Sequence, residues 1–225
     1  MFTIPWIISV VLLIASFLGI VLSAKLLSKP IDEYKFSFMR IFPFEVPNAA
    51  ENNGKYYTFS AYLFSGICFT PILLIISEQA SLKSLNPMSI LIACILGLGG
   101  LCFVFLNIFD ATHVKAHLTL FTVFAFLILL SSTLIFSRGL VAFNIFKEHG
   151  RQEYLFLISE ILAVITFIFV LLIIFNPKLK TWAVLEERDG QYYRPKRFVL
   201  AYSEWALLLT LFVNELLYFL QLLVK

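Results

Sequence analysis

Six long apolar segments alternate with shorter polar segments along this chain. An α-helix needs about 20 apolar residues to cross the hydrocarbon core of a bilayer, and each segment is about that long. The pattern therefore predicts an all-α fold: a polytopic membrane bundle of six transmembrane helices forming one domain over residues 1–225. The predicted spans are 5–27, 58–77, 88–109, 117–137, 153–175 and 198–224.

The two longest polar segments have their own patterns. In the loop before the last span, Asp189-Gly190 lies between β-favouring residues, which predicts a small β-hairpin with a tight turn. The first loop is unusually apolar around Pro43 and Pro47, so we expect it to pack on the hairpin or to lie on the membrane surface. Trp205 falls near a span end, where aromatic rings commonly anchor at the membrane interface.

Two patterns inside the spans concern packing. Pro71 can bend the second span, and its missing N–H is tolerable only where a neighbouring group satisfies the freed carbonyl. In the third span, Ala93, Gly97 and Gly100 share one helix face, so they predict close contact with another helix.

Composition supports membrane residence and argues against some functions. The chain is 60% hydrophobic and 14% charged, whereas soluble domains are about 25% charged. Its basic residues are scattered among the loops, so nucleic acid is not an expected partner. Cys68, Cys94 and Cys102 all lie within spans, which suggests no disulfide framework, and no motif indicates a cofactor.

Charge also bears on orientation, because cytoplasmic loops usually carry the excess of Lys and Arg. The loops after the first, third and fifth spans hold twelve of the 17 basic residues. This bias predicts that both termini lie outside the cytoplasm.

Three glutamates interrupt the apolar spans, namely Glu160, Glu204 and Glu215. A charged side chain at membrane depth costs about 3 kcal/mol on insertion scales, so such residues usually face the protein interior and have a partner. Glu204 and Glu215 are eleven residues apart, which separates them by only about 20° around a helix. We expect both to face into the bundle.

A second polar cluster joins the third and fourth spans: Asn107, Asp110, His113 and His117. It lies on the same side of the membrane as Glu204 if all six spans are real. A carboxylate there could form an acid/base pair with a histidine, or a structural bond that pins the last span. The spacing of Asp110, His113 and His117 could also suit a zinc-like ion, but solvated loop residues are the favoured interpretation, so we predict no metal.

The order of these features resembles the DRAM/Frag/Sfk family of six-span membrane proteins. The resemblance includes the third-span sequence ILGLGGLCFVFLNIFD, and Asn107 through Asp110 followed by His117 is similar to the autophagy-modulator branch. Ser203-Glu204-Trp205 looks like the Cys-Glu-Trp of that branch. The resemblance implies roles in membrane lipid composition, trafficking, autophagy or GPI-anchor remodelling, in an endomembrane or the plasma membrane. It also implies the orientation opposite to the one that the charge bias predicts.

Three functional hypotheses follow. The first is a non-enzymatic protein that binds membrane lipids or a membrane-protein partner. The second is an intramembrane hydrolase or acyltransferase in which His117 or His113 acts as base and Glu204 or Asp110 orients it. The third, a proton-coupled transporter using Glu160 and Glu215, is least favoured, because the sequence shows neither two related halves nor broken helices. The expected lipid or partner-binding residues are Asn107, Asp110, His117, Glu160, Glu204, Trp205 and Glu215.

Overall fold

The fold, seen in a computed structural model, is almost entirely helical. The structure describes residues 4–26, 36–49, 53–79, 87–109, 113–149, 153–177, 186–188, 191–193 and 197–223. Its helices are α1 (Ile4–Lys25), the short 3-10 helix η1 (Pro43–Glu45), α2 (Val46–Ala49), α3 (Asn53–Ile67), α4 (Thr70–Gln79), α5 (Pro87–Ile108), α6 (Val114–His149), α7 (Glu153–Ile174) and α8 (Val199–Leu223).

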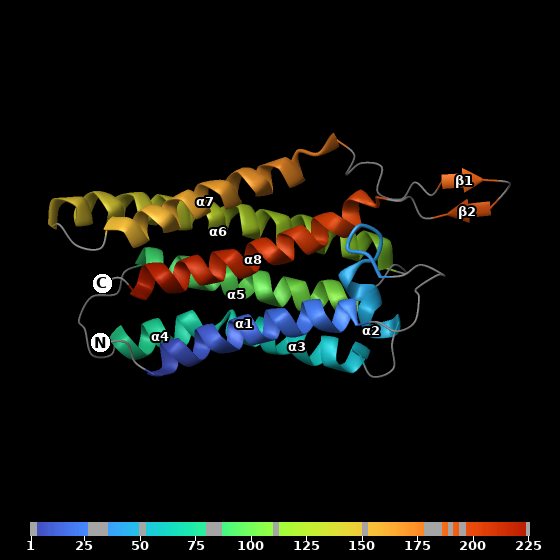
Figure 1. The fold of residues 1–225 in the computed structure, drawn as a ribbon, viewed down its shortest axis with the longest axis horizontal. Helices are drawn as coiled ribbons and strands as arrows, with labels where there is room; N and C mark the ends of the chain where they lie inside the picture. The colour runs from blue at the N-terminus through green and yellow to red at the C-terminus, as the bar shows by residue number, and fades with distance from the viewer. Residues whose placement is uncertain are drawn as a thin grey trace.

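The long helices lie side by side in one bundle, and α8 runs through its middle (Figure 1). This last helix packs against α1, α5, α6 and α7. It also carries many buried polar residues, which explains its position: polar groups at membrane depth are tolerated where other helices can cover them. We call the end of the bundle where α6 and α8 begin, and where α1, α5 and α7 finish, the His117 end.

In the described part of the chain, five helices are long and apolar enough to cross a membrane. They cover Ile4–Lys25, Gly54–Ile76, Pro87–Ile108, Lys115–Val141 and Val199–Leu222, and a shorter apolar stretch covers Glu160–Ile174 of α7. The protein is therefore an integral membrane protein with several spans.

The second span is broken, which corrects the expectation that no span is. The α-helix stops at Ile67 and restarts at Thr70, one residue before Pro71. Proline has no N–H to offer the carbonyl four residues earlier, here that of Ile67. The Thr70 hydroxyl donates to that carbonyl at 2.8 Å, so the group freed by the proline is satisfied locally, as the sequence analysis required.

The fourth span forms a longer helix than predicted, because α6 continues to His149 instead of ending near residue 137. Polarity indicates where the membrane ends, whereas a helix can continue into polar sequence, and no proline between Pro87 and Pro177 interrupts it. Arg138, one residue beyond the predicted end of the span, therefore lies within the helix and is half-buried.

The small residues of α5 make the predicted close approach. A Cβ atom on Gly97 would lie 2.8 Å from the Phe69 ring, and one on Gly100 would lie 2.9 Å from the Cβ atom of Cys68. Helix α5 thus packs tightly against the break between α3 and α4. All three cysteines are free.

Two short strands, β1 (Glu186–Arg188) and β2 (Gln191–Tyr193), pair antiparallel with Glu186 opposite Tyr193. They lie beyond the His117 end of the bundle (Figure 1). The predicted turn residues Asp189 and Gly190 fall outside the described residues.

Candidate functional site

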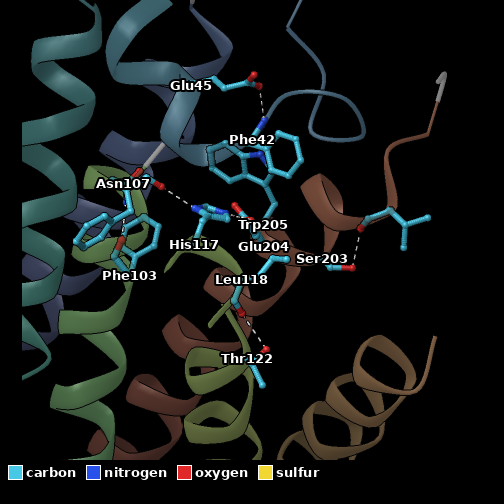
Figure 2. A network of polar contacts seen from close by, with 12 residues as sticks. Phe42, Glu45, Phe103, Asn107, His117, Leu118, Thr122, Ser203, Glu204 and Trp205 are labelled. Atoms are coloured by element: carbon cyan, nitrogen blue, oxygen red, sulfur yellow. Dashed lines mark hydrogen bonds and ion pairs between the residues drawn. The ribbon is translucent and has the colours of Figure 1, made fainter. Parts of the chain in front are cut away.

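Two helices that are distant in the sequence bring His117 and Glu204 together. His117 lies near the start of α6 and Glu204 near the start of α8, so both project into the same end of the bundle (Figure 2). The imidazole Nε2 of His117 lies 2.7 Å from Oε1 of Glu204. The two residues are only 5% and 3% exposed. The predicted approach of this carboxyl group to a histidine is therefore observed.

The geometry fixes how many protons the pair holds. The other ring nitrogen, Nδ1, lies 2.7 Å from the carbonyl oxygen of Phe109, and because a carbonyl only accepts, Nδ1 carries a hydrogen and donates. One further proton must lie between Nε2 and Oε1 to make their short contact a hydrogen bond. The pair is then either imidazole with carboxylic acid or imidazolium with carboxylate. Both forms have no net charge, which suits a buried site in a membrane protein.

This arrangement leaves His117 without a free ring nitrogen to act on a substrate. One nitrogen is held by a backbone carbonyl and the other by Glu204. The contact joins the beginning of α6, the end of α5 and the beginning of α8, so it acts as the structural bond that was the alternative interpretation.

Of the two other residues of the predicted acid/base set, the structure describes His113. His113 is exposed, and its ring packs near Phe109 with centroids 6.0 Å apart. Asp110 lies outside the described residues. Among the described residues, no group of three His, Cys, Asp or Glu side chains could hold a metal ion.

The first loop closes over the pair. Its Phe44 ring contacts the His117 ring edge-on at 4.8 Å. Trp205 is buried and its indole N–H donates to the Ile41 carbonyl at 2.7 Å. The interface-anchor interpretation of Trp205 is therefore wrong, because its polar atom has a backbone partner inside the protein. Ile41, Phe42 and Phe44 of this loop are buried, so the loop packs on the bundle.

Asn107 has a separate environment between α3 and α5. The Tyr57 hydroxyl donates to Asn107 Oδ1 at 3.1 Å, and Asn107 Nδ2 donates to the Phe103 carbonyl at 2.7 Å. A small cavity of about 160 Å³ lies beside it, bounded by Tyr57, Thr58 and Ala61 on the α3 side. Asn107 therefore links two helices near the His117 end, and neither of these hydrogen bonds goes to the His117–Glu204 pair.

The two other glutamates lie deeper along the bundle, and their carboxyl oxygens have no hydrogen-bond partner among the described residues. Glu215 is fully buried, and its carboxyl group lies beside the Cys68 thiol. Glu160 is 7% exposed, and both of its carboxyl oxygens are also unpartnered. Its carboxyl group occupies the space over Gly139, where a Cβ atom would collide with it. All three glutamates thus face inward, and Glu204 is bonded to His117 at 2.7 Å.

Several buried polar residues were not among the residues expected from the sequence. The Asn214 amide donates to the hydroxyls of Ser131 and Ser132 at 2.8 and 2.9 Å, which ties α8 to α6. The guanidinium of Arg138 lies 5.3 Å from the centre of the Tyr218 ring. A signal for part of this was present in α8, because Ser203, Thr210, Asn214 and Gln221 recur at intervals of seven, four and seven residues, which places them on one helix face. All four are buried.

An apolar groove of about 400 Å³ lies on the side of the bundle, next to the His117 end. It begins one residue after His117 on α6, and Ile174 of α7 and Leu200 of α8 complete it. Phe121 and Ala125 are buried at its floor, whereas Thr122 and Phe126 are exposed at its edge, so the groove opens toward the surroundings of the bundle. The lining residues are Leu118, Phe121, Thr122, Ala125, Phe126, Leu129, Ile174 and Leu200.

The fold and these sites define the class of the protein: a helical, multi-pass integral membrane protein with a buried, net-neutral His–Glu pair beside a lateral apolar groove. No family model, curated protein or solved structure matches the chain.

Proposed function

We propose that this protein is a six-span membrane protein that binds a membrane lipid in its lateral groove. Helix α7 supplies the sixth span, because it is 22 residues long and its described apolar part packs along α6 and α8. The resemblance to the DRAM/Frag/Sfk family leads us to place its action in membrane lipid homeostasis, trafficking or autophagy, in an endomembrane or the plasma membrane.

The groove is the observation that carries this proposal. Its volume of about 400 Å³ falls within the range of small-molecule sites, roughly 300–1,000 Å³. Six of its eight lining residues belong to the candidate span Lys115–Val141, so the groove faces the hydrocarbon region. Its one hydroxyl, that of Thr122, is bonded to the Leu118 carbonyl at 2.9 Å. The groove therefore offers an apolar wall at a depth where the surrounding molecules are lipid acyl chains.

The His117–Glu204 pair supports a binding function over an enzymatic one. A general base needs a free lone pair within reach of the proton that it removes. Both nitrogens of His117 are engaged within the protein. The pair instead holds the starts of α6 and α8 together, and these segments carry the lining residues Leu118 and Leu200 of the groove.

The proposal is tested by filling the groove. Thr122→Trp places a large ring at the exposed edge, and Ala125→Phe fills the floor. Val123→Trp is the matched control, because Val123 lies on the same helix and is exposed but does not line the groove. After purification in mild detergent, native mass spectrometry should show retained lipid in the wild type and the control, and loss of it in both groove variants.

Retention of the same lipid by all four proteins would contradict the proposal. Recovery of a stable membrane-protein partner that is lost from the groove variants would replace the lipid with a protein ligand. Equal thermal unfolding midpoints are required for the comparison, and Thr122→Trp, at an exposed position, is the variant expected to meet that requirement.

A further inference from the structure

Each wall of the lateral groove ends in a polar or cationic residue at the His117 end. On α6, Lys115 is exposed and lies three residues before Leu118, the first lining residue. Exposed Arg197 lies three residues before the lining residue Leu200 of α8. On α7, Asn176 follows Ile174 by two residues, and its amide donates to the Tyr202 hydroxyl at 3.1 Å. The end of the apolar groove nearest the His117 end of the bundle is therefore bordered by polar residues.

Helix geometry places Lys115 in line with the groove. It precedes Thr122 by seven residues, which is two turns with an offset of only about 20°. Both residues therefore lie on the same face of α6, with Lys115 about 10 Å nearer the His117 end.

The groove has the length of one leaflet. From Leu118 to Leu129 the helix rises about 16 Å, at 1.5 Å per residue. Half of a hydrocarbon core of about 30 Å is about 15 Å. An acyl chain from one leaflet can therefore lie along the whole groove while its headgroup remains at the level of Lys115 and Arg197.

Two acidic side chains described at this end are engaged inside the protein. Glu204 bonds to His117, and the carboxyl group of Glu45 accepts the Phe42 N–H at 2.9 Å. In the part of the chain that the structure describes, the exposed charges three residues before the groove on α6 and before α8 are those of Lys115 and Arg197, and both are positive. They favour a ligand with a negative headgroup.

We propose that the groove selects an anionic phospholipid, with one acyl chain along α6 and its phosphate between Lys115 and Arg197. This inference rests on the proposed function and names its ligand class. The charge bias agrees with it: the twelve basic residues of the loops at this end predict that it faces the cytoplasm, and anionic lipids are enriched in the cytoplasmic leaflet.

The test compares phosphatidylglycerol with phosphatidylcholine of identical acyl chains. Purified full-length protein is titrated with each lipid in detergent and the bound fraction is measured by native mass spectrometry. We expect phosphatidylglycerol to bind more tightly, and Lys115→Ala and Arg197→Ala each to reduce that preference about fivefold, the factor that corresponds to about 1 kcal/mol per basic residue. Excess glycerol phosphate should not displace the lipid, because the acyl chain supplies much of the affinity.

The matched control is the double variant Lys25→Ala, Lys55→Ala. These two lysines are exposed at the same end of the bundle, at the end of α1 and near the start of α3, and they lie outside the groove. The control loses the same net charge as Lys115→Ala, Arg197→Ala, yet it should keep the preference.

Equal loss in the control and the groove double variant would overturn the inference, because general surface charge would then explain the preference. Equal affinity of the wild type for both lipids would also overturn it. If Thr122→Trp still abolished binding of both lipids in that case, the lipid-binding function would stand and only the headgroup selection would fail. If glycerol phosphate alone displaced phosphatidylglycerol, the site would bind phosphate and not a lipid, and the inference would be overturned.

Discussion

Replacement of Glu204 by leucine should destabilise the protein more than loss of any other described hydrogen bond of α8. The variant removes the carboxyl group that lies 2.7 Å from Nε2 of His117, a residue that is only 5% exposed. An unsatisfied buried polar group costs about 1–3 kcal/mol. A broken buried ion pair costs about 3–5 kcal/mol. The measured loss of unfolding free energy therefore distinguishes the ion pair from the neutral pair of imidazole and carboxylic acid.

The conservative variant Glu204→Gln separates the two forms. If the pair is imidazole with carboxylic acid, the glutamine amide can donate to Nε2 in place of the acid, and stability should fall by less than about 1 kcal/mol. If it is imidazolium with carboxylate, the amide removes the negative charge and the loss should approach that of Glu204→Leu. The carbonyl stretch of a protonated carboxyl group in the infrared spectrum gives an independent measurement.

The assay is reversible unfolding in mixed micelles with increasing denaturing detergent, followed by tryptophan fluorescence. A double-mutant cycle with His117→Leu should show a coupling energy of about 1–3 kcal/mol, since the double variant removes both partners of the His117–Glu204 bond, and the loss of the Phe109 hydrogen bond cancels in the cycle. Ser203→Ala is the control on the neighbouring residue, because it removes only a hydrogen bond within the helix to Val199. Additive effects of the two single variants, or a cost for Glu204→Leu no greater than that of Ser203→Ala, would refute the reasoning.

Three further predictions concern packing and buried groups, each read from the same unfolding assay. Gly66→Ala should stabilise the protein by about 0.5–1 kcal/mol, because the residue is helical and nothing lies within 4 Å of the added Cβ atom. Gly100→Ala should destabilise it by about 1–3 kcal/mol, because the added Cβ atom would collide with the neighbouring segment. Stability changes of the same sign in the two variants would contradict this contact. Glu215→Leu should leave stability unchanged or raise it, because it removes two unpartnered buried oxygens, and a large loss would indicate a partner that the carboxyl group needs. Thr70→Val should cost about 1 kcal/mol by leaving the carbonyl of Ile67 without its donor, and no change would show that another group satisfies it.

The sequence predicted the inward face of the last helix because helical periodicity is independent of tertiary detail. Glu204 and Glu215 share a stripe by arithmetic alone, and both are buried. The order of the loops also predicted that Glu204 and the histidines lie at one end of the bundle. The sequence could not decide between His113 and His117, because the choice depends on where α6 begins and which way its first turn faces.

Other features depend on contacts that no local pattern encodes. Trp205 resembles an interface anchor in sequence, yet its indole finds the Ile41 carbonyl 164 positions away. The break near Pro71 was foreseen only as a bend, since a proline can kink a helix or interrupt it according to the packing around it. The lateral groove is a gap among three helices, so it could be found only from their arrangement.

The central position of α8 has a consequence for how the protein is made. In its candidate span 67% of the residues are buried, against 28% in α1, although α8 follows all the other helices in the chain. The first loop also relies on it, because the N–H of Phe198 donates to the Met39 carbonyl at 2.6 Å. During biosynthesis the earlier helices must therefore wait in the bilayer with an unfilled centre until α8 is inserted among them. A ribosome that stops before α8 would release a product with exposed polar groups at membrane depth, the kind of defect by which quality-control proteases recognise an unfinished membrane protein.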